Sequence, residues 1–150
     1  MGLEFYKRLF VVIIGFMQPV IILIVLGNIE SISSVWGTCL EPLFIFVNAL
    51  TSYYFFGSHK WQIPSLFILL LTSFSVVAFK DFHNVLAILF FVSCLYPLYS
   101  IKRLRFYVWF YLCSIPVGLL YGLFWAEVVG VYVICVYHIH LLFHLKKLQK

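Results

Sequence analysis

Glu41 is the strongest candidate in this sequence for proton chemistry, because its carboxyl group interrupts a long apolar stretch. At a rise of about 1.5 Å per helical residue, Glu41 and Gln18 are both expected about 12 to 14 Å inside the outer boundary of a membrane. No Lys or Arg is expected at that depth, so we expect the carboxyl group to be protonated and able to accept, donate or relay a proton. The alternative is a structural hydrogen bond to a neighbouring helix, with Gln18 as the partner.

A second set of polar side chains is expected deeper, about 18 to 22 Å from the same boundary. It consists of Asn48, His138 and His140. Burying polar and ionisable groups in a membrane is unfavourable, so such groups are candidates for functional sites. Together with Gln18 and Glu41, these three residues form the predicted intramembrane polar site.

Three prolines, Pro19, Pro42 and Pro116, are expected near the level of Gln18 and Glu41. Proline removes one helical hydrogen bond and frees a carbonyl group one turn earlier. Broken helices often line cavities in transporters, so the three prolines predict a polar pocket in the outer half of the membrane. The alternative is that proline is simply commoner in membrane helices than in soluble ones.

The last apolar run carries His140 and His144, four residues apart and therefore on one helical face. Such a pair can chelate a metal ion, and a single histidine can ligate a haem with a partner from another helix. No third ligand is expected at a matching depth, so the sequence indicates no metal site and no particular cofactor. The alternative is that both histidines lie at the membrane interface beside the basic tail.

The fifth apolar run contains a ladder of small residues, Ser114, Gly118 and Gly122, at intervals of four. Small residues at this spacing let two helix backbones approach closely. The ladder predicts a helix-packing face, which would serve either a helix of the same chain or a homo-oligomer.

The composition defines the environment that must hold these side chains. Of the 150 residues, 65% are hydrophobic and 10% are charged, and the mean hydropathy is +1.10. Soluble domains carry roughly 25% charged residues, so this chain lacks the polar surface that water requires. A crossing needs about 17 to 25 apolar residues. The sequence therefore predicts a single all-α domain over residues 1–150, with six transmembrane helices at 9–27, 34–57, 63–79, 84–101, 106–124 and 126–145.

The distribution of basic residues predicts the orientation of these helices. With six crossings, nine of the ten Lys and Arg residues fall on one side: Lys7, Arg8, Lys60, Lys102, Arg103, Arg105, Lys146, Lys147 and Lys150. Basic residues in short loops stay in the cytoplasm, which places both termini there, in a plasma or bacterial inner membrane. The net charge of +5 does not indicate nucleic-acid binding, because the basic residues form short clusters between apolar runs.

Three functions remain open at this stage. The first is a channel, transporter or ion-responsive module, expected to be oligomeric, with Glu41 and Gln18 lining its site. The second is an accessory, immunity-type or effector-type subunit that acts by binding another membrane protein. The third is a membrane-embedded enzyme on a lipid or isoprenoid, although acid–base catalysis needs groups within hydrogen-bond reach and the expected depths separate Glu41 from His140.

Overall fold

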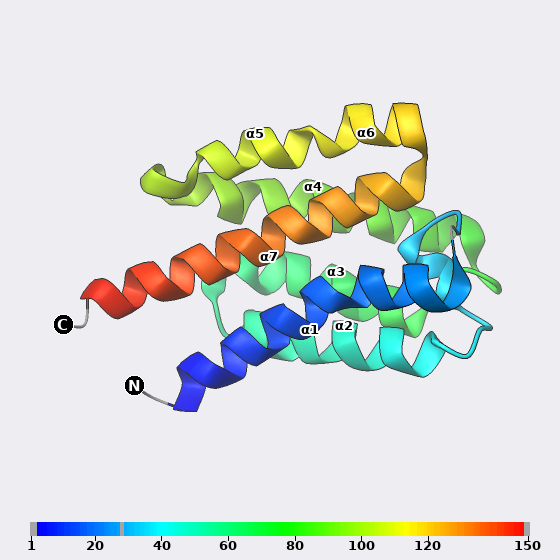
Figure 1. The fold of residues 1–150 in the computed structure, drawn as a ribbon, viewed down its shortest axis with the longest axis horizontal. Helices are drawn as coiled ribbons and strands as arrows, with labels where there is room; N and C mark the ends of the chain where they lie inside the picture. The colour runs from blue at the N-terminus through cyan, green and yellow to red at the C-terminus, as the bar shows by residue number, and fades with distance from the viewer. Residues whose placement is uncertain (1–2, 28, 149–150) are drawn as a thin grey trace.

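The computed structural model describes residues 3–27 and 29–148, and over these residues the fold is helical throughout, without strands (Figure 1). The prediction of an all-α fold is confirmed. Asn28, in a predicted loop, and Lys150, in the predicted basic tail, lie outside the described residues, and for Lys146 and Lys147 only the helical backbone is described. Three helices are long and apolar enough to cross a membrane: α1 (Leu3–Leu26), α4 (Lys80–Ser100) and α7 (Leu123–Leu148).

The other helices are shorter. They are α2 (Glu41–Phe56), α3 (Gln62–Ser73), and the consecutive pair α5 (Phe106–Leu112) and α6 (Ser114–Tyr121), which form one rod interrupted at Cys113. Short 3-10 turns connect the rods: η1 (Ile32–Val35), η2 (His59–Trp61) and η3 (Lys102–Leu104).

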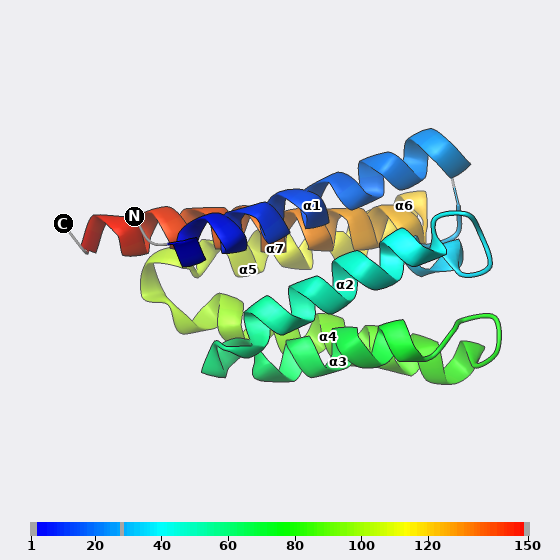
Figure 2. The same cartoon turned by 90° about the horizontal axis from the view of Figure 1, so that it is seen from below.

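The rods form two layers, with α1, α7 and the α5–α6 rod in one and α2, α3 and α4 in the other (Figures 1 and 2). Successive rods run antiparallel, so α1 begins and α7 ends at the same end of the bundle as η2 and η3 (Figure 1). We call this the basic end, after Lys60, Lys102 and Arg103. The opposite end, which carries η1, Glu30 and Asp81, is the acidic end.

The second helix begins at Glu41, not at residue 34 as predicted. Residues 32–35 form η1, and Gly37 turns the chain with a φ of +79°, a conformation that favours glycine. Pro42 then lies in the first turn of α2, where its missing N–H leaves no helical bond unmade. Pro42 therefore starts a helix and does not break one.

The third helix ends at Ser73, whereas the sequence predicted helix up to residue 79. The hydroxyl groups of Thr72 and Ser73 both donate to the carbonyl oxygen of Leu69, at 2.6 and 3.1 Å. Such side-chain bonds compete with the helical ladder. Residues 74–79 then form turns that lead directly into α4.

The helix predicted over 106–124 is divided in two and ends early. Pro116 cannot donate to the carbonyl group of Leu112, and its ring crowds that carbonyl, so α5 ends at Leu112. Gly122, at a φ of +96°, ends α6 and allows α7 to begin at Leu123. The last helix, predicted to start at residue 126, therefore starts three residues earlier, and Glu127 lies in its second turn.

Two hydrophobic clusters close the ends of the bundle. Residues of η2, η3 and neighbouring helices form the cluster at the basic end, which includes Trp61, Leu98, Leu104 and Tyr137. The cluster at the acidic end is built around η1 and includes Ile22, Val35, Phe44, Phe124 and Val128. Polar side chains are buried between these two clusters.

Candidate functional site

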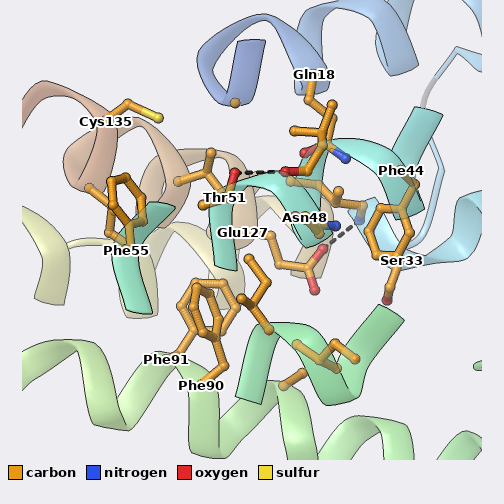
Figure 3. A pocket seen from close by; sticks show the side chains of 18 of the residues that line it. Gln18, Ser33, Phe44, Asn48, Thr51, Phe55, Phe90, Phe91, Glu127 and Cys135 are labelled. Atoms are coloured by element: carbon orange, nitrogen blue, oxygen red, sulfur yellow. Dashed lines mark hydrogen bonds between the residues drawn. The ribbon is translucent and has the colours of Figure 1, made fainter. Parts of the chain in front are cut away.

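A cavity of about 100 Å³ lies inside the bundle, lined by residues of α1, η1, α2, α3, α4 and α7 (Figure 3). Three of the predicted site residues line it together: Gln18, Asn48 and His138, which are 4%, 9% and 6% exposed. Figure 3 shows Gln18 and Asn48 directed toward the same space as a residue that the sequence analysis did not select, Glu127. The cavity is therefore lined by residues from both of the depths at which the sequence predicted polar side chains.

Glu127 is the acidic side chain of this cavity. It is 7% exposed, and its Oε2 accepts a hydrogen bond of 2.5 Å from the backbone N–H of Ile32. Ile32 is the first residue of η1, where backbone N–H groups have no partner within the turn, so the carboxyl group caps that turn. No Lys or Arg is among the residues that line the cavity.

Three buried nitrogen atoms on the cavity wall have no hydrogen-bond partner among the described residues. They are Nε2 of Gln18, Nε2 of His83 and Nε2 of His138. An unpaired buried polar group costs about 1 to 3 kcal/mol, so native proteins rarely keep several in one place without a purpose. Three such atoms in one cavity with a buried carboxyl group distinguish this cavity from an ordinary packing defect.

His83 is completely buried, although its position between two apolar runs predicted a loop. Its Nδ1 lies 2.6 Å from the carbonyl oxygen of Phe74. A carbonyl oxygen only accepts hydrogen bonds, so Nδ1 carries the hydrogen. In the neutral ring Nε2 is then the atom with the free lone pair, and it lies on the cavity wall.

His138 lies toward the basic end of the cavity. Its ring is stacked on Phe55, with centroids 4.0 Å apart and planes 10° apart, and it contacts Trp61 at 4.4 Å. These two aromatic rings fix the orientation of the imidazole and separate the cavity from the basic end.

The remaining predicted site residues do not join the cavity. Glu41 is the first residue of α2 and is only partly buried; its Oε2 accepts a 2.7 Å bond from the N–H of Gly37. The expectation that Glu41 lies deep within a helix is wrong, because the chain turns at Gly37 and the helix starts later. His140 is exposed and its Nδ1 lies 3.3 Å from the hydroxyl group of Tyr107.

His140 and His144, the two histidines that could chelate a metal ion, have no third ligand close by among the described residues. His144 is partly buried, and within the described part of the chain no three His, Cys, Asp or Glu side chains gather closely enough to hold a metal ion.

The small-residue ladder packs within the chain. A Cβ atom added at Gly118 would lie 2.9 Å from the Cβ of Ala126 in α7, so the two backbones are in close approach there. Ser114 is buried, whereas Gly122 serves the turn between α6 and α7. Beside this contact, α4, α5, α6 and α7 surround an apolar groove of about 600 Å³ that includes Leu95 and Ile115.

The signal that would have revealed Glu127 is the pattern of the last helix. Residues 127, 131, 134, 135 and 138 all line the cavity, and their spacing of four, three, one and three puts them on one face of α7. That face reads Glu, Val, Ile, Cys, His. The periodicity was visible in the sequence, but a helix start placed at residue 126 put Glu127 at the predicted membrane boundary and not inside the bundle.

No protein-family model matches the chain, and neither the curated proteins nor the solved structures yielded a match.

Proposed function

We propose that this protein is a membrane-embedded module that binds small cations, protons included, in the cavity around Glu127 and conducts them across the membrane. The observation that carries the proposal is the buried carboxyl group of Glu127 in one cavity with three unpaired nitrogen atoms. Intramembrane groups of this kind are expensive to bury and mark ion or proton pathways.

The size of the cavity supports a small cargo. Sites for organic ligands occupy roughly 300 to 1,000 Å³. A volume of about 100 Å³ is instead on the scale of a few water molecules, each of which takes about 30 Å³ of liquid. A lipid or a nucleotide does not fit there.

The charge of the lining supports a cation. Glu127 is the acidic residue of the cavity, and no Lys or Arg side chain lines it. The amide groups of Gln18 and Asn48 and the hydroxyl group of Thr51 supply further oxygen atoms on the wall. Oxygen atoms next to a single carboxyl group attract a positive charge more than a negative one.

We further propose that all six rods cross the membrane, with both termini in the cytoplasm. The rods α2, α3 and α5–α6 are about 24, 18 and 24 Å long, against a hydrocarbon core of about 30 Å. Local thinning of the bilayer and cover from the three longer helices accommodate such short rods. The basic end, with Lys60, Lys102 and Arg103, is then the cytoplasmic end.

Cysteine labelling tests this orientation. Cys39 is exposed between η1 and α2 at the acidic end, whereas Cys113 is exposed midway along the α5–α6 rod. In single-cysteine variants on intact cells, we expect a membrane-impermeant maleimide to label Cys39 and not Cys113. Labelling of Cys39 only after permeabilisation would reverse the orientation, and labelling of Cys113 would place that rod in water.

Ion flux tests the transport function. Proteoliposomes of the purified protein should show uptake of protons, Na⁺ or K⁺ that falls by at least about tenfold in Glu127→Gln, because the charge that attracts the cation is lost. The glutamine retains an oxygen atom for the N–H of Ile32, so the fold is preserved. Glu41→Gln is the matched control, since that carboxyl group lies outside the cavity, and it should leave the flux unchanged. Absence of flux of every ion, or flux indifferent to Glu127→Gln, contradicts the proposal.

A second candidate function is an accessory subunit that binds another membrane protein, or a homo-oligomer of this chain. The observation that favours it is the apolar groove of about 600 Å³ between α4 and α6, which is wide enough for the side chains of a partner helix. A stoichiometric partner that co-purifies with a protein inactive in every flux assay would favour this function over transport.

A further inference from the structure

We infer that the cation is the proton, and that Glu127, His83 and His138 are the groups that hold it on its way through the bundle. The inference rests on the proposed transport function and specifies its cargo. The groups on the cavity wall, their orientation and their order along the bundle all bear on it.

The chemistry of the cavity wall favours a proton over a metal cation. Hard metal cations are usually held by six or more oxygen ligands. This wall instead combines one carboxyl group with two imidazole nitrogen atoms, Nε2 of His83 and Nε2 of His138. Imidazole and carboxyl groups in buried sites exchange protons, and histidine is the side chain whose charge most readily changes at neutral pH.

His83 is oriented as a proton acceptor toward the cavity. Its Nδ1–H is held by the carbonyl group of Phe74, so the neutral ring presents a lone pair, not a hydrogen, to the cavity at Nε2. A histidine anchored in this way is a fixed proton acceptor. The anchoring carbonyl group also stabilises the positive ring once Nε2 has taken up a proton.

The three groups lie in order along the bundle, with His83 and Glu127 near the acidic end and His138 farther toward the basic end. Glu127 and His83 lie about 6 and 4.5 Å from the first residues of α7 and α4, which both begin at the acidic end. His138 lies eleven residues beyond Glu127, or about 16 Å farther toward the basic end. The cavity connects these positions, with Gln18, Asn48 and Thr51 on its wall between them.

A proton crosses this distance only through bridging water. The cavity has the volume for about three water molecules, and its polar wall provides the partners that ordered water requires. In each passage the O–H bond of protonated Glu127 breaks and an N–H bond forms at Nε2 of His138, while every bridging water gains one proton and loses one. His83 first takes up a proton at Nε2 from the acidic end. That N–H bond then breaks as an O–H bond forms on the carboxylate of Glu127, and His83 returns to its neutral form.

The aromatic rings around His138 complete the path. The ring stacks on Phe55 at 4.0 Å and contacts Trp61 at 4.4 Å, and aromatic faces stabilise an adjacent cation. They therefore offset part of the cost that burial imposes on the protonated ring. The same rings separate the cavity from the basic end, so His138 is the last group to hold the proton before it leaves.

The test measures protons and metal cations separately in proteoliposomes, with a pH-sensitive dye inside and with ion-selective dyes for Na⁺ and K⁺. The variants are Glu127→Gln, His138→Phe, which keeps the aromatic stack, and His83→Asn, which keeps a donor for the carbonyl group of Phe74. His140→Phe is the matched control, because His140 is exposed on the same helix two residues from His138. His138→Gln is a second variant should the phenylalanine disturb folding, and circular dichroism and elution volume report whether each variant is folded.

We expect proton uptake by the unaltered protein and a loss of at least about tenfold in all three cavity variants, with the His140 control unchanged. Na⁺ or K⁺ uptake that requires Glu127 without proton uptake would overturn the inference and leave the proposed function standing. Proton uptake that survives in folded His138 and His83 variants would overturn the relay. No uptake of any ion would overturn both.

Discussion

The polar cavity and the apolar groove share a wall, yet they place opposite demands on what occupies them. Four residues line both hollows: Ser33, Ala87, Phe91 and Glu127. The groove has about six times the volume of the cavity, about 600 against 100 Å³. Nevertheless, of the buried polar atoms without a partner in the described part of the chain, three line the cavity and none lines the groove.

The difference shows that the volume of a hollow does not indicate where the reactive polar groups of this helix bundle lie. An apolar groove that faces the hydrocarbon core fills with lipid tails at little cost, because those tails are as apolar as leucine. A polar cavity in the same surroundings needs a polar occupant, since each unpaired group remains a free-energy penalty. The smaller hollow is therefore the better candidate for a functional site, and the larger one is a candidate surface for helix packing.

Gly118→Ala, in the wall of the groove, should change the free energy of unfolding more than Gln18→Leu in the wall of the cavity. The new methyl group would lie 2.9 Å from the Cβ of Ala126, an atom fixed to the backbone of α7 that cannot move aside without separating the helices. Overpacking of this kind costs about 1 to 3 kcal/mol. The loss should appear as a lower free energy of unfolding in detergent, measured by denaturant titration, while the ion flux of the folded protein stays normal.

Gly57→Ala is the control for the glycine replacement itself. A Cβ atom at Gly57 meets no atom within 4 Å, and its φ of −64° suits any residue, so stability should not fall. If Gly118→Ala instead abolished flux without loss of stability, the groove would belong to the functional site and the contrast between the two hollows would fail.

The sequence predicted the rods well and their ends poorly. Hydropathy alone located the six rods, because each rod is a run of mostly apolar residues between polar connections. Three of the errors occur at Gly37, Pro116 and Gly122, where backbone conformation overrides hydropathy: two glycines at positive φ and a proline one turn after a helix end. A single residue of this kind decides where a helix ends, but it hardly changes the mean hydropathy of a twenty-residue segment.

The candidate site was predicted in part for the same reason. Gln18, Asn48 and His138 lie well inside their helices, so an error of a few residues at the ends did not move them out of the bundle. Glu41 and Glu127 both lie close to the start of a helix. Because those two helices begin a few residues away from their predicted starts, Glu127 lines the cavity and Glu41 does not. His83 was missed because the short turns before α4 fold back over it, and the Phe74 carbonyl contact that shows this exists only in three dimensions.

Gln18→Leu should change stability much less than Gly118→Ala, and for an instructive reason. If water or a hydrated cation occupies the cavity, the Nε2 of Gln18 is satisfied there, and replacing the side chain by a slightly smaller apolar one changes the free energy of unfolding by no more than about 0.5 kcal/mol. Flux should nevertheless fall, because a leucine at this position removes a polar partner from the wall. Met17→Leu, at an exposed neighbouring position on α1, controls for the added leucine.

The opposite result would also be informative. A gain of about 1 to 3 kcal/mol in Gln18→Leu would mean that the amide nitrogen has no partner at all in the native protein, since relief of a truly unpaired group stabilises by that amount. The cavity would then be dry, and a dry cavity cannot pass a proton over the distance of about 16 Å from Glu127 to His138. The sign and size of this one stability change therefore separate a hydrated path from a strained but empty core, independently of any flux assay.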